Sequence, residues 1–184
     1  MILKVSRLGH PVIRTAAAPV EPKQINTPEF QTLLDDMVET MREYSGVGLA
    51  APQVHLSIQV AVLEVEEHPR YPDMPPISLT YLINPRLTVL DSASVEDWEG
   101  CLSIPEMRGV VPRFKQLHVT ALGRKGEPLD FIATDFHARV IQHENDHLKG
   151  EVYLDRMPDM RTLGHLHEWQ HYVLPEINRR ESEN

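Results

Sequence analysis

The segment that decides both the fold and the chemistry of this chain reads Gln142-His143-Glu144-Asn145-Asp146-His147-Leu148. The residues around it predict a helix over about residues 135–149, closed by Gly150, because glycine readily ends a helix in the left-handed conformation. One side of this helix carries four residues, Phe136, Val140, His143 and His147. Two imidazoles therefore lie on the side of the helix that is expected to face the core.

The two histidines of this segment are four residues apart, so on a helix both rings point the same way and can reach one metal ion. Glu144 lies beside the pair, where its carboxylate can handle the protons of a water molecule instead of binding the ion. The segment therefore indicates a metal site in the second half of the chain.

The same pattern occurs a second time, as His167-Glu168-Trp169-Gln170-His171. We expect a third helix over residues 160–173, stopped by Pro175, since proline cannot continue a helix. The second pair lies at the margin of an apolar stripe, and the chain offers no second cysteine to accompany it. We interpret these histidines as partly exposed residues of a helix, and any further role for them stays open.

The rest of the pattern favours an α+β fold, with antiparallel sheets packed around the central metal-binding helix, one N-terminal helix and one C-terminal helix. Thr27 and Pro28 predict the start of the N-terminal helix, because threonine caps a helix and proline suits its first turn. Strands are predicted at about residues 58–65, 79–83, 86–90, 109–111 and 116–122. Residues 123–128 predict a hairpin turn, and residues 68–76, with four prolines, predict a loop.

We expect one catalytic domain over residues 1–184, with a frayed polar tail at 179–184. The net charge of −9 argues against broad binding to nucleic acids or anionic membranes. No apolar stretch predicts a membrane span, and residues 1–4 do not begin a signal peptide. The single cysteine excludes an internal disulfide, which favours a cytoplasmic protein.

That cysteine lies in the stretch Glu99-Gly100-Cys101-Leu102-Ser103-Ile104-Pro105, and a glycine-rich loop reads Gly46-Val47-Gly48-Leu49-Ala50-Ala51-Pro52-Gln53. Together with residues 142–148, these stretches closely resemble the three motifs of peptide deformylases, in the same order and spacing. The resemblance extends over most of the chain, from Leu8-Gly9-His10-Pro11 to about Asp155. It assigns the metal site to the first histidine pair.

The resemblance implies that Cys101, His143 and His147 bind one divalent metal ion, iron(II) in the cell, which zinc, nickel or cobalt can replace. Three protein ligands leave one position open for water, which is typical of a catalytic metal site. A thiol must lose its proton to bind a metal, so this role also gives the lone cysteine a function.

The implied activity is removal of the N-terminal formyl group from the formyl-methionine of nascent polypeptides. Hydroxide on the metal would attack the formyl carbon, while Glu144 would take a proton from the water and later pass one to the leaving amine. The side-chain amide of Gln53 and the backbone N–H of Leu102 would donate to the oxyanion. The residues implied to bind the substrate are Val47, Gly48 and Val140, with Gly48 allowing close approach of the peptide backbone.

Glu99 is expected to support the site from outside the ligand set, paired with an arginine such as Arg113. Asp146 and Gln142 are further candidates for orienting the imidazoles, and the sequence leaves open which group orients which ring. Arg139 departs from the family, because many relatives carry an aliphatic residue there. Its stem either forms one wall of the methionine pocket or is displaced from it.

The implied partners are N-formyl-methionyl nascent peptides. Docking on the ribosome near the exit tunnel is left open. No specificity for a nucleic-acid sequence and no membrane binding are expected. Two rival functions share parts of the pattern. A metalloprotease with the same histidine pair takes its third ligand from downstream of the helix, whereas Cys101 lies upstream. A non-catalytic peptide- or ribosome-binding relative would be expected to have lost Glu144, Gln53 or Cys101, and all three are present.

Overall fold

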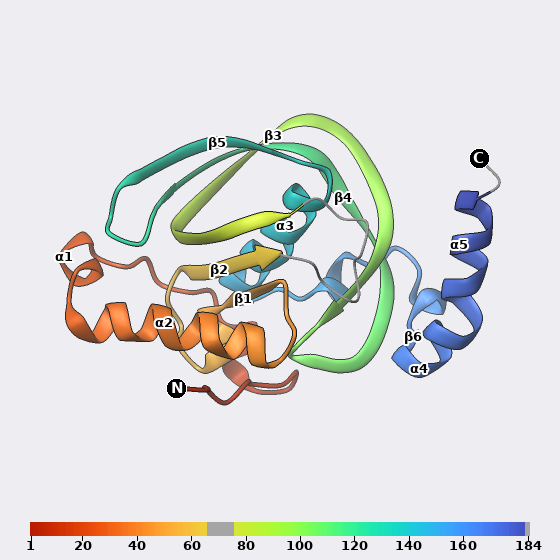
Figure 1. Ribbon diagram of the computed structural model, residues 1–184, viewed down its shortest axis with the longest axis horizontal. Helices are drawn as coiled ribbons and strands as arrows, with labels where there is room; N and C mark the ends of the chain where they lie inside the picture. The colour runs from red at the N-terminus through yellow and green to blue at the C-terminus, as the bar shows by residue number, and fades with distance from the viewer. Residues whose placement is uncertain (66–75, 183–184) are drawn as a thin grey trace.

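The computed structural model describes residues 1–65 and 76–182, and Figure 1 shows how their elements are arranged. Antiparallel strands follow the order β1-β2-β3-β4-β5, and β6 pairs with β4. The strands are β1 (Gly48–Ala50), β2 (Val60–Val65), β3 (Ile77–Cys101), β4 (Ile104–Leu122), β5 (Pro128–Thr134) and β6 (Gly164–His165). The helices are α1 (Pro22–Ile25), α2 (Pro28–Glu43), α3 (Asp135–Lys149), α4 (Leu166–Glu168) and α5 (Leu174–Ser182). These elements confirm the predicted α+β class.

The central helix α3 contacts strands on several sides, including β1, β2, β4 and β5. Its predicted bounds are confirmed, and Gly150 ends it in the left-handed conformation with φ +77°. A Cβ atom at this glycine would lie 2.9 Å from the backbone of Arg14, so the close approach also requires glycine. Ten residues of α3 are buried, and this burial places the histidine pair inside the molecule.

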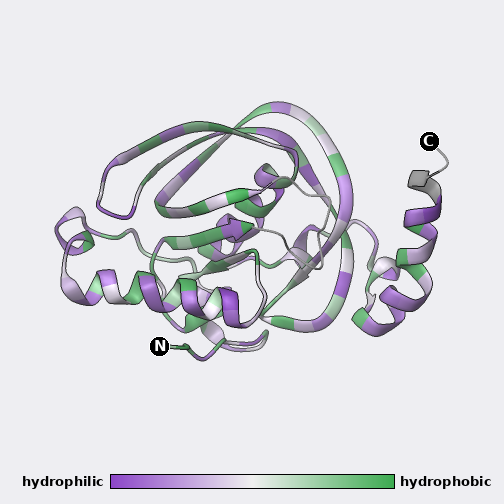
Figure 2. Ribbon diagram, viewed as in Figure 1, coloured by the Kyte–Doolittle hydropathy of each residue, from purple (hydrophilic) through white to green (hydrophobic). Residues whose placement is uncertain are grey.

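The N-terminal helix α2 begins where Thr27 and Pro28 predict it. The Thr27 hydroxyl accepts a hydrogen bond from the backbone N–H of Phe30 at 3.4 Å, and so caps the helix. Apolar and polar stretches alternate along the ribbon of α2 in Figure 2, as expected for a helix with one buried face. The buried residues of that face are Phe30, Leu34, Met37, Val38, Thr40 and Met41.

The four short strands predicted between β2 and α3 all lie within strands, but their division is wrong, because β3 and β4 are long strands that form one curved hairpin (Figure 1). The register shifts near Ile83, Val89, Asp91 and Glu99, and such bulges bend a strand without ending it. Residues 88–97 are exposed, so their side chains show no alternation that could reveal a strand. The predicted turn between β4 and β5 is confirmed, and the predicted loop at 68–76 lies almost entirely outside the described residues.

The predicted single helix over residues 160–173 is also wrong. The chain forms a 3₁₀ turn at Met160–Thr162, then β6, α4, a π-helical turn at Trp169–Val173, and α5. Pro175 does not stop a helix, because the chain stays helical from α4 through the π-turn into α5, and Pro175 is the second residue of α5. The expected frayed tail at 179–184 overlaps the end of α5 and the undescribed residues 183–184. No helix in the described ranges is long and apolar enough to cross a membrane.

Candidate metal centre and active site

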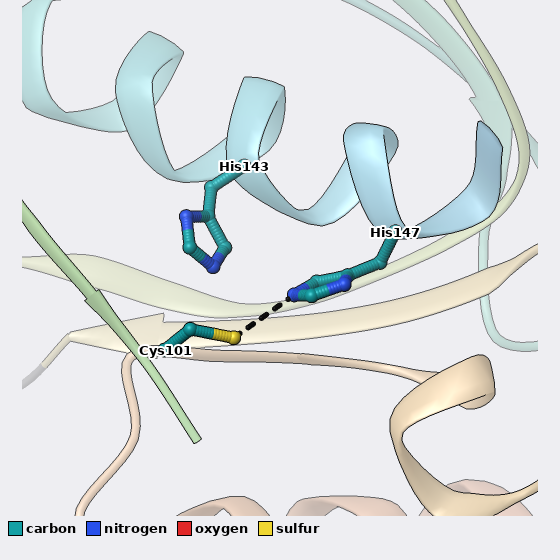
Figure 3. A group of neighbouring side chains, drawn as sticks. All are labelled: Cys101, His143 and His147. Atoms are coloured by element: carbon teal, nitrogen blue, oxygen red, sulfur yellow. Dashed lines mark hydrogen bonds between the residues drawn. The ribbon is translucent and has the colours of Figure 1, made fainter. Parts of the chain in front are cut away.

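Two elements bring one cysteine and two histidines together at the centre of the molecule. Cys101 is the last residue of β3, where the chain turns tightly so that Cys101 pairs with Ile104. His143 and His147 project from successive turns of α3 toward Cys101, as Figure 3 shows. One donor atom from each residue lies within 4.8 Å of the other two, and Cys101 Sγ lies 3.2 Å from His147 Nε2. No other set of three such residues with this geometry occurs in residues 1–65 or 76–182.

The Cys101 thiol and the His143 imidazole stabilise each other's charged forms. Burial alone would raise the pKa of the Cys101 thiol, but the neighbouring His147 and His143 lower it well below its ordinary value. Burial would likewise lower the pKa of His143, but hydrogen bonds to Cys101 and Glu99 raise it. A thiolate next to two imidazoles is a donor set that suits zinc and iron(II). The residues present therefore fit a divalent metal ion.

Glu144 lies between the two histidines in sequence and is only 3% exposed. Burial raises the pKa of its carboxyl to about 7. One carboxyl oxygen, Oε2, is buried and has no hydrogen-bond partner among the described residues. The other oxygen lies so close to Gly48 that a Cβ atom there would approach it to 2.3 Å, so Gly48 leaves room for this carboxylate.

Gln53 is fixed beside the cysteine. Its side-chain Oε1 accepts a hydrogen bond from the backbone N–H of Ala50 at 2.8 Å, which leaves the amide Nε2 facing the site. That nitrogen lies 3.4 Å from Cys101 Sγ and 3.3 Å from the hydroxyl of Ser103. The backbone N–H of Ser103 also points to the sulfur, at 3.4 Å. The sequence analysis did not assign a role to Ser103. Its position two residues after Cys101 was the one indication that it lies near the sulfur.

Glu99 is the centre of a buried network next to His143. Its Oε2 lies 2.9 Å from His143 Nδ1, and Arg113 donates to both of its oxygens at 2.9 Å. Burial would raise the pKa of Glu99, but hydrogen bonds from Arg113 and His143 hold it well below its ordinary value. An ionised carboxylate at Nδ1 fixes the ring orientation of His143 and leaves the other ring nitrogen, Nε2, available to bind a metal ion.

Arg139 belongs to the same network, which sequence reasoning did not foresee. Its guanidinium donates to Glu99 Oε1 at 2.8 Å and to the backbone oxygens of Val111 at 2.9 Å and Val95 at 2.6 Å. One side chain of α3 is thereby tied to both long strands. Its position four residues before His143, on the same side of the helix, was the signal in the sequence.

Gln142 and Asp146, the two further candidates for orienting the imidazoles, make no hydrogen bond to either ring and contact other groups. Gln142 exchanges hydrogen bonds with the backbone N–H and C=O of Phe114, at 3.1 and 2.9 Å, and so joins α3 to β4. Asp146 pairs with Arg113 and Arg156. Nδ1 of His147 is buried and has no partner among the described residues.

A cavity of about 310 Å³ opens beside Cys101 and His143, which both line it. Its lining includes the residues that the sequence singles out for substrate binding, Val47, Gly48 and Val140, together with Gln53, Leu102 and Glu144. Arg139 also lines it, as does Phe136. β1 is the terminal strand of the sheet order, so its outer edge faces no other strand among the described residues. An extended peptide can pair with such an edge.

The chain is similar to several proteins named as peptide deformylases. Peptide deformylase 1 of Nitrosomonas europaea is 48% identical over 165 residues, which covers 90% of this chain and 93% of that protein. Peptide deformylase 2 of Pseudomonas putida is 43% identical over the same shares of the two chains. The crystal structure of a class I type b peptide deformylase from Acinetobacter baumannii with Met-Ala-Ser bound superposes with a TM-score of 0.83. It is 37% identical and covers 85% of this chain and 99% of its own.

Residues 2–162 of the chain match the family described as Polypeptide deformylase. That range contains the cysteine, both histidines of α3 and the glycine-rich loop, and it ends before the second histidine pair. The chain therefore belongs to the polypeptide deformylase family, whose members are metal-dependent hydrolases that remove the N-terminal formyl group from nascent polypeptides.

Proposed function

We propose that this site removes the formyl group with one divalent ion, iron(II) in the cell, held by Cys101, His143 and His147. The observation that carries the proposal is the convergence of one buried sulfur and two imidazoles within 4.8 Å, beside a cavity. Such an ion supplies Lewis acidity, which polarises the formyl carbonyl and makes water nucleophilic near neutral pH. Zinc, nickel or cobalt can occupy the same donor set.

Glu144 acts as general base and then as general acid. A carboxyl group whose pKa is raised to about 7 can accept a proton from water and return it to the leaving amine near neutral pH. The unpartnered Oε2 supports this role, because a buried carboxylate oxygen without a hydrogen bond is costly unless it serves a reactant. Gly48 leaves room for this carboxylate, since a Cβ atom there would lie 2.3 Å from its other oxygen.

Gln53 and Leu102 stabilise the negative charge that develops on the formyl oxygen. The Gln53 amide is held in one orientation by Ala50, so its N–H groups are directed toward the metal donors before substrate arrives. The backbone N–H of Leu102, next to Cys101, is the second donor. Loss of one such donor typically lowers turnover by about 10²–10³-fold.

The substrate is a formyl-methionyl peptide, whose methionine side chain enters the apolar part of the cavity at Val47 and Val140. Glu99 and Arg113 support the ligand His143 from behind. The Acinetobacter baumannii relative with Met-Ala-Ser bound supports a peptide of this kind, since that tripeptide is the product expected from formyl-Met-Ala-Ser. Action on nascent chains places the proposed activity in the cytoplasm. Docking on the ribosome stays a prediction, which cosedimentation with ribosomes tests.

The proposed function is tested with three substrates on one metal-loaded preparation: formyl-Met-Ala-Ser, acetyl-Met-Ala-Ser and a longer unblocked peptide. The cavity is closed around the donors by Gly48, Gln53 and Leu102, so the methyl of an acetyl group displaces the carbonyl from its donors. We expect the acetyl peptide to react more slowly by well over the roughly 10- to 200-fold that one methylene yields in a soft pocket. Comparable rates on the two blocked peptides, or internal cleavage that depends on Glu144, would overturn the proposal.

The identity of the metal is tested by anaerobic purification and metal analysis of the same sample that is assayed. If the ion is iron(II), activity decays in air and persists longer after replacement by nickel or cobalt, because oxidation of the iron or of the Cys101 thiolate disables the site. Equal lifetimes of the iron and nickel forms in air would contradict iron as the metal and would leave the reaction untouched.

A further inference from the structure

The segment that follows the family match reaches back to the cavity. β6 pairs with β4, with Gly164 opposite Arg108 and His165 opposite Met107. This pairing fixes the start of α4, and its first residue, Leu166, lines the cavity beside the donor atoms. Part of the cavity wall therefore comes from residues beyond position 162, where the match to the family ends.

A contact between the two tryptophans of the chain holds this segment in place. The rings of Trp98 and Trp169 meet edge to face, with centroids 5.9 Å apart and planes at 61°. Trp98 belongs to β3 and lines the same cavity as Leu166. The indole Nε1 of Trp169 is buried and has no hydrogen-bond partner in the part of the chain that the structure describes. Apolar packing is thus the interaction that seats Trp169.

The distance of this wall from the donor atoms matches a position along a bound peptide. Trp98 precedes Cys101 by three residues of β3, which corresponds to at most about 10 Å, since the strand has an irregularity between Glu99 and Cys101. An extended peptide covers about 10 Å with three residues. A peptide held by its formyl group at Cys101 and running toward Trp98 therefore brings its second or third residue to Leu166.

We propose that Leu166, positioned by the packing of Trp169 on Trp98, determines specificity for an apolar side chain at the second or third residue of the substrate. The wall includes the Leu166 side chain and the Trp98 ring, which favour contact with apolar groups, and Arg108, which pairs opposite Gly164, lines the same cavity. The inference rests on the proposed function, because it takes a formyl-methionyl peptide as the occupant of the cavity.

Kinetics with substrates of two lengths test this proposal. Leu166→Ala and Trp169→Ala are expected to lower kcat/KM for formyl-Met-Leu-Leu by about 10-fold, within the range that removal of apolar contacts produces. The same variants should leave kcat/KM for formyl-methionine amide unchanged, since that substrate ends before the wall. Tyr172→Ala is the matched control, because Tyr172 lies in the same segment and is 65% exposed. An equal loss on both substrates, or no loss on either, would overturn the inference.

Fluorescence gives a second readout that does not depend on turnover. Both tryptophans of the chain lie in the contact, so tryptophan emission, excited selectively over the five tyrosines, reports on it. Titration with the product peptide Met-Leu-Leu should shift the emission, whereas methionine amide at saturation should not. An emission unchanged by saturating tripeptide contradicts the proposed wall. Absence of formate release from every substrate, with the shift preserved, contradicts the proposed function and leaves the wall supported.

Discussion

His143 and His147 lie on a regular α-helix inside the molecule, whereas His167 and His171 lie at the surface on α4 and the π-turn that follows it. Both pairs have the same sequence pattern and the same spacing. The side chain of His143 is 12% exposed, and that of His167 is 85% exposed. The same histidine pattern therefore occurs in two different environments, and only the first environment suits the proposed metal site.

The rings of the two pairs are oriented differently. In α3 the ring planes stand at 75° with centroids 5.1 Å apart, so lone pairs from both rings can converge on one point. In the second pair the planes are stacked at 7° with centroids 6.4 Å apart. No third residue of a metal-binding type completes a group with the second pair in residues 1–65 or 76–182.

The glutamates of the two copies differ as well. Glu144 is buried against Gly48 and beside the cavity. The side chain of Glu168 is 60% exposed, and it lies 3.1 Å from Nδ1 of His167. A general base needs a site that excludes bulk water and holds the reactant, and only the first glutamate has one.

The largest difference between the two histidine pairs is expected when single proposed metal ligands are replaced by alanine. Cys101→Ala, His143→Ala and His147→Ala should each lose stoichiometric metal and all measurable activity, because two remaining donors hold the ion poorly and no longer orient water. His167→Ala and His171→Ala should keep both. Metal analysis and formate release on the same samples measure the outcome. Full metal in Cys101→Ala, or its loss in His171→Ala, would break the distinction between the two pairs.

The glutamates provide the next test. Glu144→Gln should retain metal but lose turnover by about 10²–10⁴-fold, since an amide cannot accept the proton of water. Glu168→Gln makes the same chemical change in the second copy and should leave kcat and metal content unchanged. The measurement is single-substrate kinetics at known metal occupancy. Unchanged turnover in metal-loaded Glu144→Gln would show that this residue is not the base.

The sequence predicted α2 and α3 well because their signals are local. Thr27 caps α2 directly, and Gly150 ends α3 at a left-handed position that few other residues tolerate. The long hairpin of β3 and β4 could not be predicted in the same way. Its middle is exposed and bends at bulges, so cross-strand pairing maintains it without a periodic pattern of apolar residues.

The motifs predicted that Cys101, His143, Glu144 and Gln53 belong to one site. In the structure all four residues line one cavity. The sequence indicated that Arg139 lies on the same side of α3 as His143, but it did not indicate which groups Arg139 contacts. Whether an arginine on the buried side of a helix lines a pocket or pairs with a carboxylate depends on Glu99, forty residues away in the chain. The π-turn at Trp169–Val173 was equally hidden, since a regular helix satisfies the same local pattern.

Arg139 allows a smaller test of why the first pair binds metal. Arg139→Leu removes one of the two guanidiniums that hold Glu99, while Arg113 stays in place. We expect metal affinity to fall by about 10- to 100-fold, as is typical when the group behind a ligating histidine is disturbed. Arg161→Leu is the control, because Arg161 is 91% exposed and pairs with Asp159 at the surface. An unchanged metal dissociation constant in Arg139→Leu would show that Arg113 alone fixes Glu99.

The smallest expected effect concerns the two glycines next to the histidine pairs, Gly150 after the first and Gly164 before the second. Gly150 has φ +77°, and a Cβ atom there would meet the backbone of Arg14 at 2.9 Å, so Gly150→Ala suffers both strain and a clash. We expect a loss of about 2 kcal/mol in the free energy of unfolding, or about 4–8 °C in Tm for a chain of this size. A Cβ atom at Gly164 meets nothing within 4 Å, so Gly164→Ala should stay within about 0.5 kcal/mol of the parent. Thermal unfolding of the metal-free proteins measures both, because bound metal would add its own stabilisation to the folded state. Equal Tm values for the two variants would mean that the end of α3 adapts to a side chain, and that the first histidine pair rests on a less rigid scaffold than the contact with Arg14 indicates.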